Sequence, residues 1–139
     1  MSHVRRQIRE AVATAVTGLS TTSTRVFQSR VYPLRDADLP CLLVSTESEE
    51  IEPATIGSIV QRAMEIHVKA VAKANVNLDD TLDQIALEVE TAMAGAIPLA
   101  HLSKIDVDMD DALEKPTGVL TLTYRITVFT AAGNPGTLI

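Results

Sequence analysis

Apolar residues recur at helical spacing in two segments of the chain. The first segment runs from His3 to Leu19, and its stripe consists of Val4, Ile8, Ala11, Val12, Ala15, Val16 and Leu19. The second begins at a capping residue, Asn77 or Asp79, and ends before Gly95. Its stripe consists of Leu78, Leu82, Ile85, Val89, Ala92 and Met93. Both segments are therefore predicted to be amphipathic helices that bury one face.

Alternation of apolar and polar residues predicts strands elsewhere. Two short β candidates, Val26 to Tyr32 and Cys41 to Thr46, precede a long alternating strand from Ser58 to Val71. Two further strands follow the second helix, and the turn from Lys115 to Gly118 predicts that they form a hairpin. Their apolar positions are Ile105, Val107 and Met109 in the first strand, and Leu120, Leu122, Tyr124, Ile126 and Val128 in the second.

The order of these elements, α-β-β-β-α-β-β, predicts an α+β fold. We expect a mostly antiparallel sheet with two helices packed on one face, and the other face available to a partner or to water. With 139 residues, of which 46% are hydrophobic, the chain is expected to form one domain over residues 1–139. Only residues 133–139 are predicted to be a flexible C-terminal tail, and residues 20–24 a mobile loop.

Charge and composition disfavour several classes of partner. The formal net charge of −6 argues against recognition of nucleic acid, which relies on a clustered excess of Lys and Arg. The chain has two Phe, two Tyr and no Trp, so a base-stacking surface is not expected either. It carries neither the long apolar run of a membrane span nor a signal-peptide pattern, and we expect a cytoplasmic protein with no membrane partner.

The sequence offers no pattern typical of a catalytic or cofactor site. His3, His67 and His101 have no metal-ligand spacing, and we interpret them as solvent-facing structural residues. Cys41 lies in an apolar strand and is expected to be a small buried side chain. The sequence therefore predicts a protein that is not an enzyme and has no cofactor.

Three aspartates are candidate metal ligands because of their spacing. Asp106, Asp108 and Asp110 have the spacing of the first three ligands of a calcium loop, but Asp111 and Thr117 stand where that loop needs Gly and Glu. Since the aspartates alternate with apolar residues, we interpret them as the wet acidic face of a strand. A small acidic module that binds a metal or another ligand remains the alternative from another functional class.

Charged residues indicate where the domain would contact a partner. Arginines crowd the first turns of the first helix, where the helix dipole disfavours positive charge, and an acidic stretch after Thr46 is predicted to be an extended loop. Arg62 interrupts the apolar face of the long strand, so it either reaches solvent at the sheet edge or makes a specific ionic contact. The alternative is that the arginines and the acidic stretch are solvated surface. The candidate interface residues are Arg5, Arg6, Arg9, Glu47, Glu49, Glu50, Glu52 and Arg62.

Taken together, these segments resemble the tail terminator (tail completion) proteins of long-tailed bacteriophages, the lambda-type minor tail protein U group. The likeness lies in the order and spacing of five stretches across nearly the whole chain. They are HVRRQIREAVATAVTGL, RVYPLRDADLPCLLV with the acidic stretch after it, the long strand, LDDTLDQIALEVE and TLTYRITVFT.

The resemblance implies a virion protein at the head-proximal end of the tail, assembled in the host cytoplasm. Such a subunit forms a hexameric ring with copies of itself, stops polymerisation of the tail tube protein and offers a surface to the head-tail connector protein. A ring needs two different subunit surfaces. We assign one to the arginines of the first helix and the other to the acidic stretch and sheet edge. A head-tail connector or neck ring subunit is the alternative among virion proteins.

Overall fold

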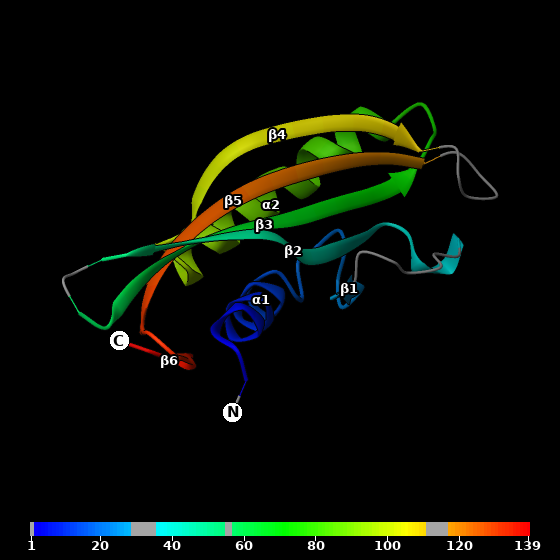
Figure 1. The fold of residues 1–139 in the computed structure, drawn as a ribbon. Helices are drawn as coiled ribbons and strands as arrows, with labels where there is room; N and C mark the ends of the chain where they lie inside the picture. Colours follow the sequence, from blue (N-terminus) through cyan, green and yellow to red (C-terminus); the bar gives the residue numbers. More distant parts are fainter. Residues whose placement is uncertain (1, 29–35, 55–56, 111–116) are drawn as a thin grey trace.

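A computed structural model describes residues 2–28, 36–54, 57–110 and 117–139. It shows one sheet with two helices on one face, which confirms the predicted α+β class and element order (Figure 1). The elements are α1 (Val4–Ala15), β1 (Val26–Phe27), a short 3-10 helix η1 (Asp36–Asp38), β2 (Cys41–Pro53), β3 (Ile59–Lys73), α2 (Leu78–Ala96), β4 (His101–Asp110), β5 (Thr117–Ala131) and β6 (Asn134–Leu138).

The sheet has the strand order β1-β2-β3-β5-β4, and β6 pairs with β5. β1 is parallel to β2, whereas the other pairs are antiparallel. β4 and β5 pair antiparallel as predicted, with Ile105 opposite Leu122. Residues 115 and 116 of the predicted turn lie outside the described residues. The long strand β3 lies in the middle, where Val68 pairs with Val44 on one side and with Leu122 on the other.

The core lies between the helices and one face of the sheet. α1 packs on β2, and α2 packs on β3 and β5. The helices bury the apolar stripes found in the sequence, apart from Ala11, which is exposed. Burial of these stripes against alternate residues of the strands supplies the main favourable term in folding, about 25 cal/mol per Å² of apolar surface. The largest fully buried side chains include Leu42, Met64, Ile66, Leu82, Ile85, Met93 and Leu122.

Strand β2 corrects the prediction that the acidic stretch is a loop. β2 continues to Pro53, seven residues beyond Thr46, with a register shift between Thr46 and Ser48. The strand extends because the first half of β3 supplies a pairing partner, in which Glu49 faces Met64. The like charges are tolerated because Glu50 and Glu52 project into solvent, while Glu49 is paired with arginines. Of the first β candidate, only Val26–Phe27 is a strand, and residues 29–32 lie outside the described residues.

The outermost strand β4 differs from its prediction as well. Its acidic face is wet, but the apolar face is also exposed: Ile105 is 42%, Val107 59% and Met109 53% accessible. Their register partners Leu122 and Leu120 lie under α2 in the core. α2 covers β3 and β5, and β4 extends beyond this cover.

Residues 20–24, predicted to be a mobile loop, form turns that are attached to α2. Thr22 is fully buried, and the Glu88 carboxylate accepts hydrogen bonds from the Thr21 backbone N–H at 3.0 Å and the Thr21 hydroxyl at 2.8 Å. Burial alone would raise the pKa of Glu88, but the hydrogen bonds from Gln84 and Thr21 outweigh it and the pKa is lowered. Glu88 therefore connects the turns that follow α1 to the middle of α2.

Replacing Glu88 by glutamine is expected to lower the free energy of unfolding by about 1 kcal/mol at pH 7. Because the folded pKa is lowered, the carboxylate stabilises the fold above its unfolded pKa of roughly 4.3 and loses this effect as the pH falls through the folded pKa. Urea denaturation of both proteins should therefore show a difference at pH 7 that narrows at acidic pH. An equal difference at pH 7 and at roughly pH 3.5 would contradict this role.

The C-terminal segment is also part of the sheet, which corrects the expectation of an unattached tail. β6 pairs with β5 through Leu138 opposite Thr130 and Asn134 opposite Ala131. The side-chain amide of Gln7 in α1 donates to the carbonyls of Ser2 at 2.7 Å and of Gly136 at 2.8 Å. Both ends of the chain are thus fixed to α1 and lie on the same side of the molecule (Figure 1).

Candidate subunit interface

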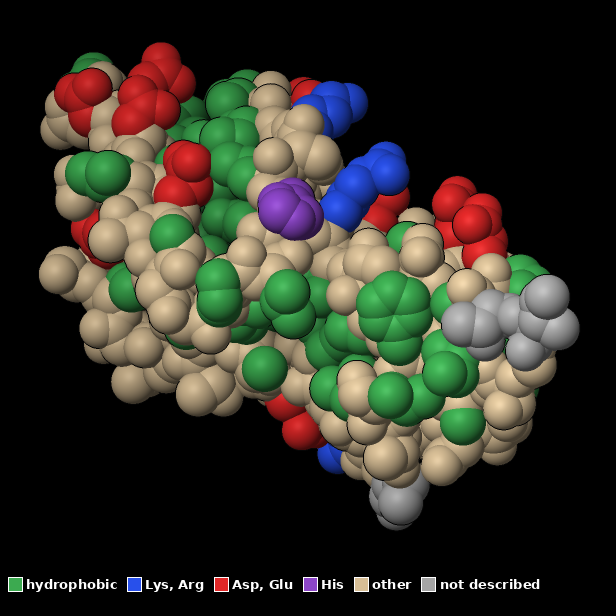
Figure 2. Space-filling view, turned by 90° about the vertical axis from the view of Figure 1, so that its left-hand side faces the viewer, with side chains coloured by type: hydrophobic (Ala, Val, Ile, Leu, Met, Phe, Trp, Pro, Cys, Tyr) green, Lys and Arg blue, Asp and Glu red, His purple; other side chains and the backbone are tan. Residues whose placement is uncertain are grey.

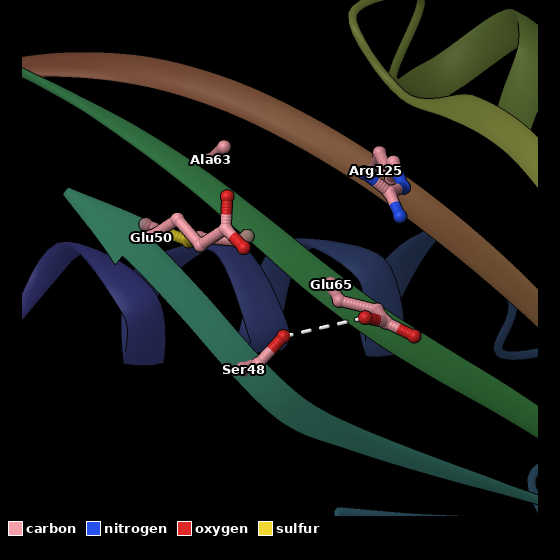
Figure 3. Close-up of a pocket in the computed structure, with 6 residues that line it drawn as sticks. Ser48, Glu50, Ala63, Glu65 and Arg125 are labelled. Atoms are coloured by element: carbon pink, nitrogen blue, oxygen red, sulfur yellow. Dashed lines mark hydrogen bonds between the residues drawn. The ribbon is translucent and has the colours of Figure 1, made fainter. Parts of the chain in front are cut away.

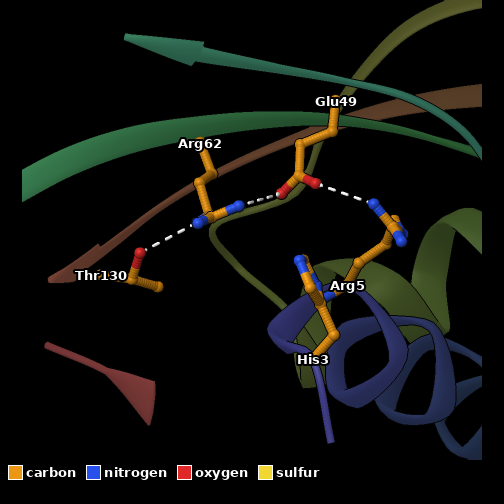
Figure 4. Close-up of polar contacts among 5 residues, drawn as sticks. All are labelled: His3, Arg5, Glu49, Arg62 and Thr130. Carbon is orange, nitrogen blue, oxygen red and sulfur yellow. Dashed lines mark hydrogen bonds and ion pairs between the residues drawn. The ribbon is translucent and has the colours of Figure 1, made fainter. Parts of the chain in front are cut away.

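Three of the predicted interface residues meet in one ionic cluster inside the chain (Figure 4). The Glu49 carboxylate lies 3.0 Å from Arg5 Nη1 and 3.2 Å from Arg62 Nη1. The Glu49 and Arg62 side chains are only 6% and 8% exposed, whereas Arg5 is 45% exposed. Arg62 also donates from Nε to the Thr130 hydroxyl at 2.9 Å. The cluster joins α1, β2, β3 and β5.

This cluster decides whether Arg62 reaches solvent at the sheet edge or makes a specific ionic contact. The guanidinium makes a specific ionic contact, because its charge is buried on the helix-bearing face and satisfied by Glu49 and Thr130. Arg5 and Glu49, which the sequence placed on two opposite subunit surfaces, contact each other within one chain. Sequence reasoning identified both partners but had no means of finding that β2 carries Glu49 to the start of α1.

The other two candidate arginines lie at the surface. Arg6 pairs with Glu10 at 2.8 Å, and their side chains are 62% and 48% exposed. Arg9 Nε lies 3.4 Å from the side-chain oxygen of Gln28. Exposed pairs of this kind contribute little to folding, so these arginines remain accessible to another molecule. That they contact a neighbouring subunit remains a prediction.

The sheet face without helices carries a polar cluster around His67. The ring nitrogens Nδ1 and Nε2 each lie 3.2 Å from a carboxylate oxygen, of Glu47 and Glu65 respectively. His67 is thus held between two side chains, with 20% exposure, which corrects its assignment as solvent-facing. The hydrogen bond from His67 lowers the pKa of Glu65, against a smaller opposing effect of burial, and the Ser48 hydroxyl and Arg125 lower it further.

Figure 3 shows the hollow beside this cluster, lined by Ser48, Glu50, Ala63, Glu65 and Arg125. The Ser48 hydroxyl lies 3.3 Å from Glu65 Oε2 and donates to this carboxylate. In the common serine-histidine arrangement an imidazole is the immediate base of the serine, whereas here the Ser48 hydroxyl contacts a carboxylate. Among the described residues, no three His, Cys, Asp or Glu side chains are placed to hold a metal ion.

Cys41 is fully buried, as predicted, and its thiol is free. Burial raises the pKa of Cys41 to about 12, with Asp38 adding to the rise and Arg25 opposing it. At pH 8 only roughly one thiol in ten thousand is then a thiolate, the form that reacts with electrophiles.

We therefore expect iodoacetamide to leave Cys41 unmodified in native buffer and to alkylate it within minutes in concentrated urea. Mass spectrometry of samples quenched at intervals measures both rates. Comparable rates in the two solutions would contradict the burial of this thiol.

Exposed apolar side chains form a second set of candidate contacts that the sequence did not single out. One group is Ile105, Val107 and Met109 on β4. Others lie towards the end of the sheet near β6, where Ile51, Phe129, Leu138 and Ile139 are 41–70% exposed, with Ile51 and Phe129 on opposite faces of the sheet. Figure 2 faces that end and shows apolar side chains gathered at its lower right, and a band of them higher up beside acidic side chains. In the sequence, alternation identified the β4 residues as apolar but could not show that α2 stops short of them.

Comparison with known proteins identifies the family. No curated protein matches the chain. The family model of phage minor tail protein U matches residues 3–128, from the start of α1 almost to the end of β5. In the described part of the chain, neither helix is long and apolar enough to cross a membrane. Because the match covers nearly the whole chain, the protein belongs to the phage minor tail protein U family and is a component of a phage tail.

Proposed function

We propose that the protein is a tail terminator. In this function, six copies form a ring on the head-proximal end of the completed tail tube. The ring stops addition of further tube protein and presents a surface to which the head-tail connector attaches. The family match supports a place in the tail, and the fold supports a role carried out by surfaces.

The exposed apolar face of β4 is the observation that carries the proposal. β4 is the last strand in the sheet order, so its outer edge has no strand beside it in the described chain. A long free edge with exposed apolar residues invites association, and soluble monomers usually block or cover such edges. Here three neighbouring apolar positions are 42–59% exposed. We infer that assembly with another subunit covers this surface.

Electron microscopy of the purified protein, alone and with its tail tube protein, tests the proposal. We expect six-fold rings with a central opening, and tubes that carry a ring at one end only. Tubes grown with the protein present should also be shorter, since capped ends stop growing. A protein that stays monomeric at all concentrations, or rings that bind the neck but never the tube, would contradict it. The second result would favour a connector subunit.

A further inference from the structure

Resting on the proposed ring function, we infer that β4 of one copy docks on α1 of the next copy. α1 of the next copy would lie along the free edge of β4, which borders the apolar residues on one face of the strand and Asp106 and Asp108 on the other. Arg6 and Arg9 would reach these carboxylates around that edge. The juxtaposition follows from complementary charge, from exposed apolar area and from the places of the two elements in the fold.

The acidic partner is the outer strand. β4 contains one lysine and three aspartates, a net charge of −2 with His101 neutral. Lys104 and Asp106 are accessible, since their side chains are 67% and 54% exposed and their mutual contact at 3.3 Å is a surface pair. The apolar side chains of Ile105, Val107 and Met109 alternate with the acids. β4 thus carries an apolar row on one face and a row of carboxylates on the other, and both border its free edge.

The basic partner is the first helix. α1 contains three arginines and one glutamate, a net charge of +2. Arg5 is held by the buried Glu49, but Arg6 is 62% exposed and pairs with a solvent-exposed glutamate one turn away. Arginine stems cover apolar surface while their guanidinium groups bind carboxylates, often through two hydrogen bonds. The helix therefore offers the chemistry that β4 requires.

The fold places the two partners on opposite sides of the subunit. α1 packs on β2, near one edge of the sheet, and β4 forms the other edge. In Figure 1, β4 lies along the upper edge of the molecule and α1 below β2. A contact between two different surfaces on opposite sides repeats from copy to copy and closes a ring when the rotation fits.

Docking of β4 on a strand edge of the next copy explains a ring less well than docking on α1. β4 against β4 of a second copy is a two-fold contact, which closes a dimer instead of a ring. β4 against the outer half of β2 would bring Asp106 and Asp108 beside Glu50 and Glu52, and like charges facing each other across strands are destabilising. The arginine-bearing helix remains the complementary surface.

Charge reversal on each partner tests the pairing. The variant with Asp106→Arg and Asp108→Arg, and the variant with Arg6→Glu and Arg9→Glu, should each raise the midpoint concentration of assembly at least about tenfold in light scattering. Glu50→Arg with Glu52→Arg is the matched control, because it makes the same charge change at exposed positions of another strand. This control should assemble like the wild type.

Mixing the two interface variants gives the sharpest result. In a 1:1 mixture each reversed surface finds its complement only on the other variant, so the mixture should assemble again with the two variants alternating. An even-numbered ring such as a hexamer can close in this way. Circular dichroism confirms that each variant is folded before it is mixed.

The possible failures are distinguishable. If wild-type rings form and the β4 variant assembles as well as the wild type, the docking inference is wrong while the ring function stands. The same holds if folded variants fail to rescue each other, or if the Glu50 and Glu52 variant is the one that loses assembly. If the wild type never assembles, the ring function and this inference both fall.

Discussion

The variant Glu49→Gln is expected to lose about 3 to 5 kcal/mol of unfolding free energy, the largest effect of any single polar substitution in this fold. Glu49 and Arg62 are 6% and 8% exposed, and the carboxylate is the charge that neutralises the buried guanidinium. Glutamine keeps the shape of the side chain but leaves Arg62 charged in a site with little water. The cost of that uncompensated charge is therefore much larger than the loss of one surface ion pair.

The next residue provides a matched control. Glu50 is exposed on the opposite face of β2, and Glu50→Gln should change the unfolding free energy by less than about 0.5 kcal/mol. Urea denaturation below the concentration of assembly measures both variants. If Arg62→Met is added to Glu49→Gln, part of the loss should be recovered, because no unpaired charge remains. Equal stabilities of the Glu49 and Glu50 variants would contradict the proposed role of the cluster.

Leu122→Ala should have the second large effect, a loss of about 2 to 5 kcal/mol. Leu122 is fully buried in β5 beneath the helices, and truncation both removes apolar burial and leaves a cavity. Its cross-strand partner Ile105 lies on the same face of the sheet but is 42% exposed. Ile105→Ala should therefore cost the monomer less than about 1 kcal/mol.

Denaturation of both variants at a concentration where the protein is monomeric measures this contrast. Ile105→Ala should weaken assembly more than Leu122→Ala does, provided that both variants are folded. The reason is that Ile105 belongs to the surface that we propose is covered in the ring. If Ile105→Ala destabilises the monomer as strongly as Leu122→Ala, the apolar face of β4 is buried in the single chain and offers no docking surface.

Periodicity in the sequence was sufficient to predict the elements of the core. The stripes of α1 and α2 and the alternation in β3 and β5 identified them because each element is amphipathic and buries one face. Periodicity could not show the lateral extent of the cover over the sheet. The alternation of β4 is as regular as that of β5, yet only β5 lies under a helix. The difference depends on where α2 lies, which is a tertiary property.

Charge patterns in the sequence also could not show which charged residues are brought together in the fold. Arg62 stood out because a cation interrupted an apolar face, and the structure confirms an ionic contact there. The acidic stretch was predicted to be a loop because like charges repel along an isolated segment. In the fold, β3 pairs with that segment and arginines from two elements neutralise its one buried carboxylate. Local repulsion was outweighed by partners that are 13 and 44 residues away in the chain.

The attachment of both chain ends to Gln7 has a practical consequence for locating the protein in a virus particle. Since Ser2 and Gly136 are bonded to one side chain, a peptide label fused to either terminus would mark the same corner of each subunit. In the proposed six-membered ring, two independent labels should then give coincident density in a reconstruction, as six spots at one level along the tail axis. The level of those spots would show which rim of the ring faces the capsid.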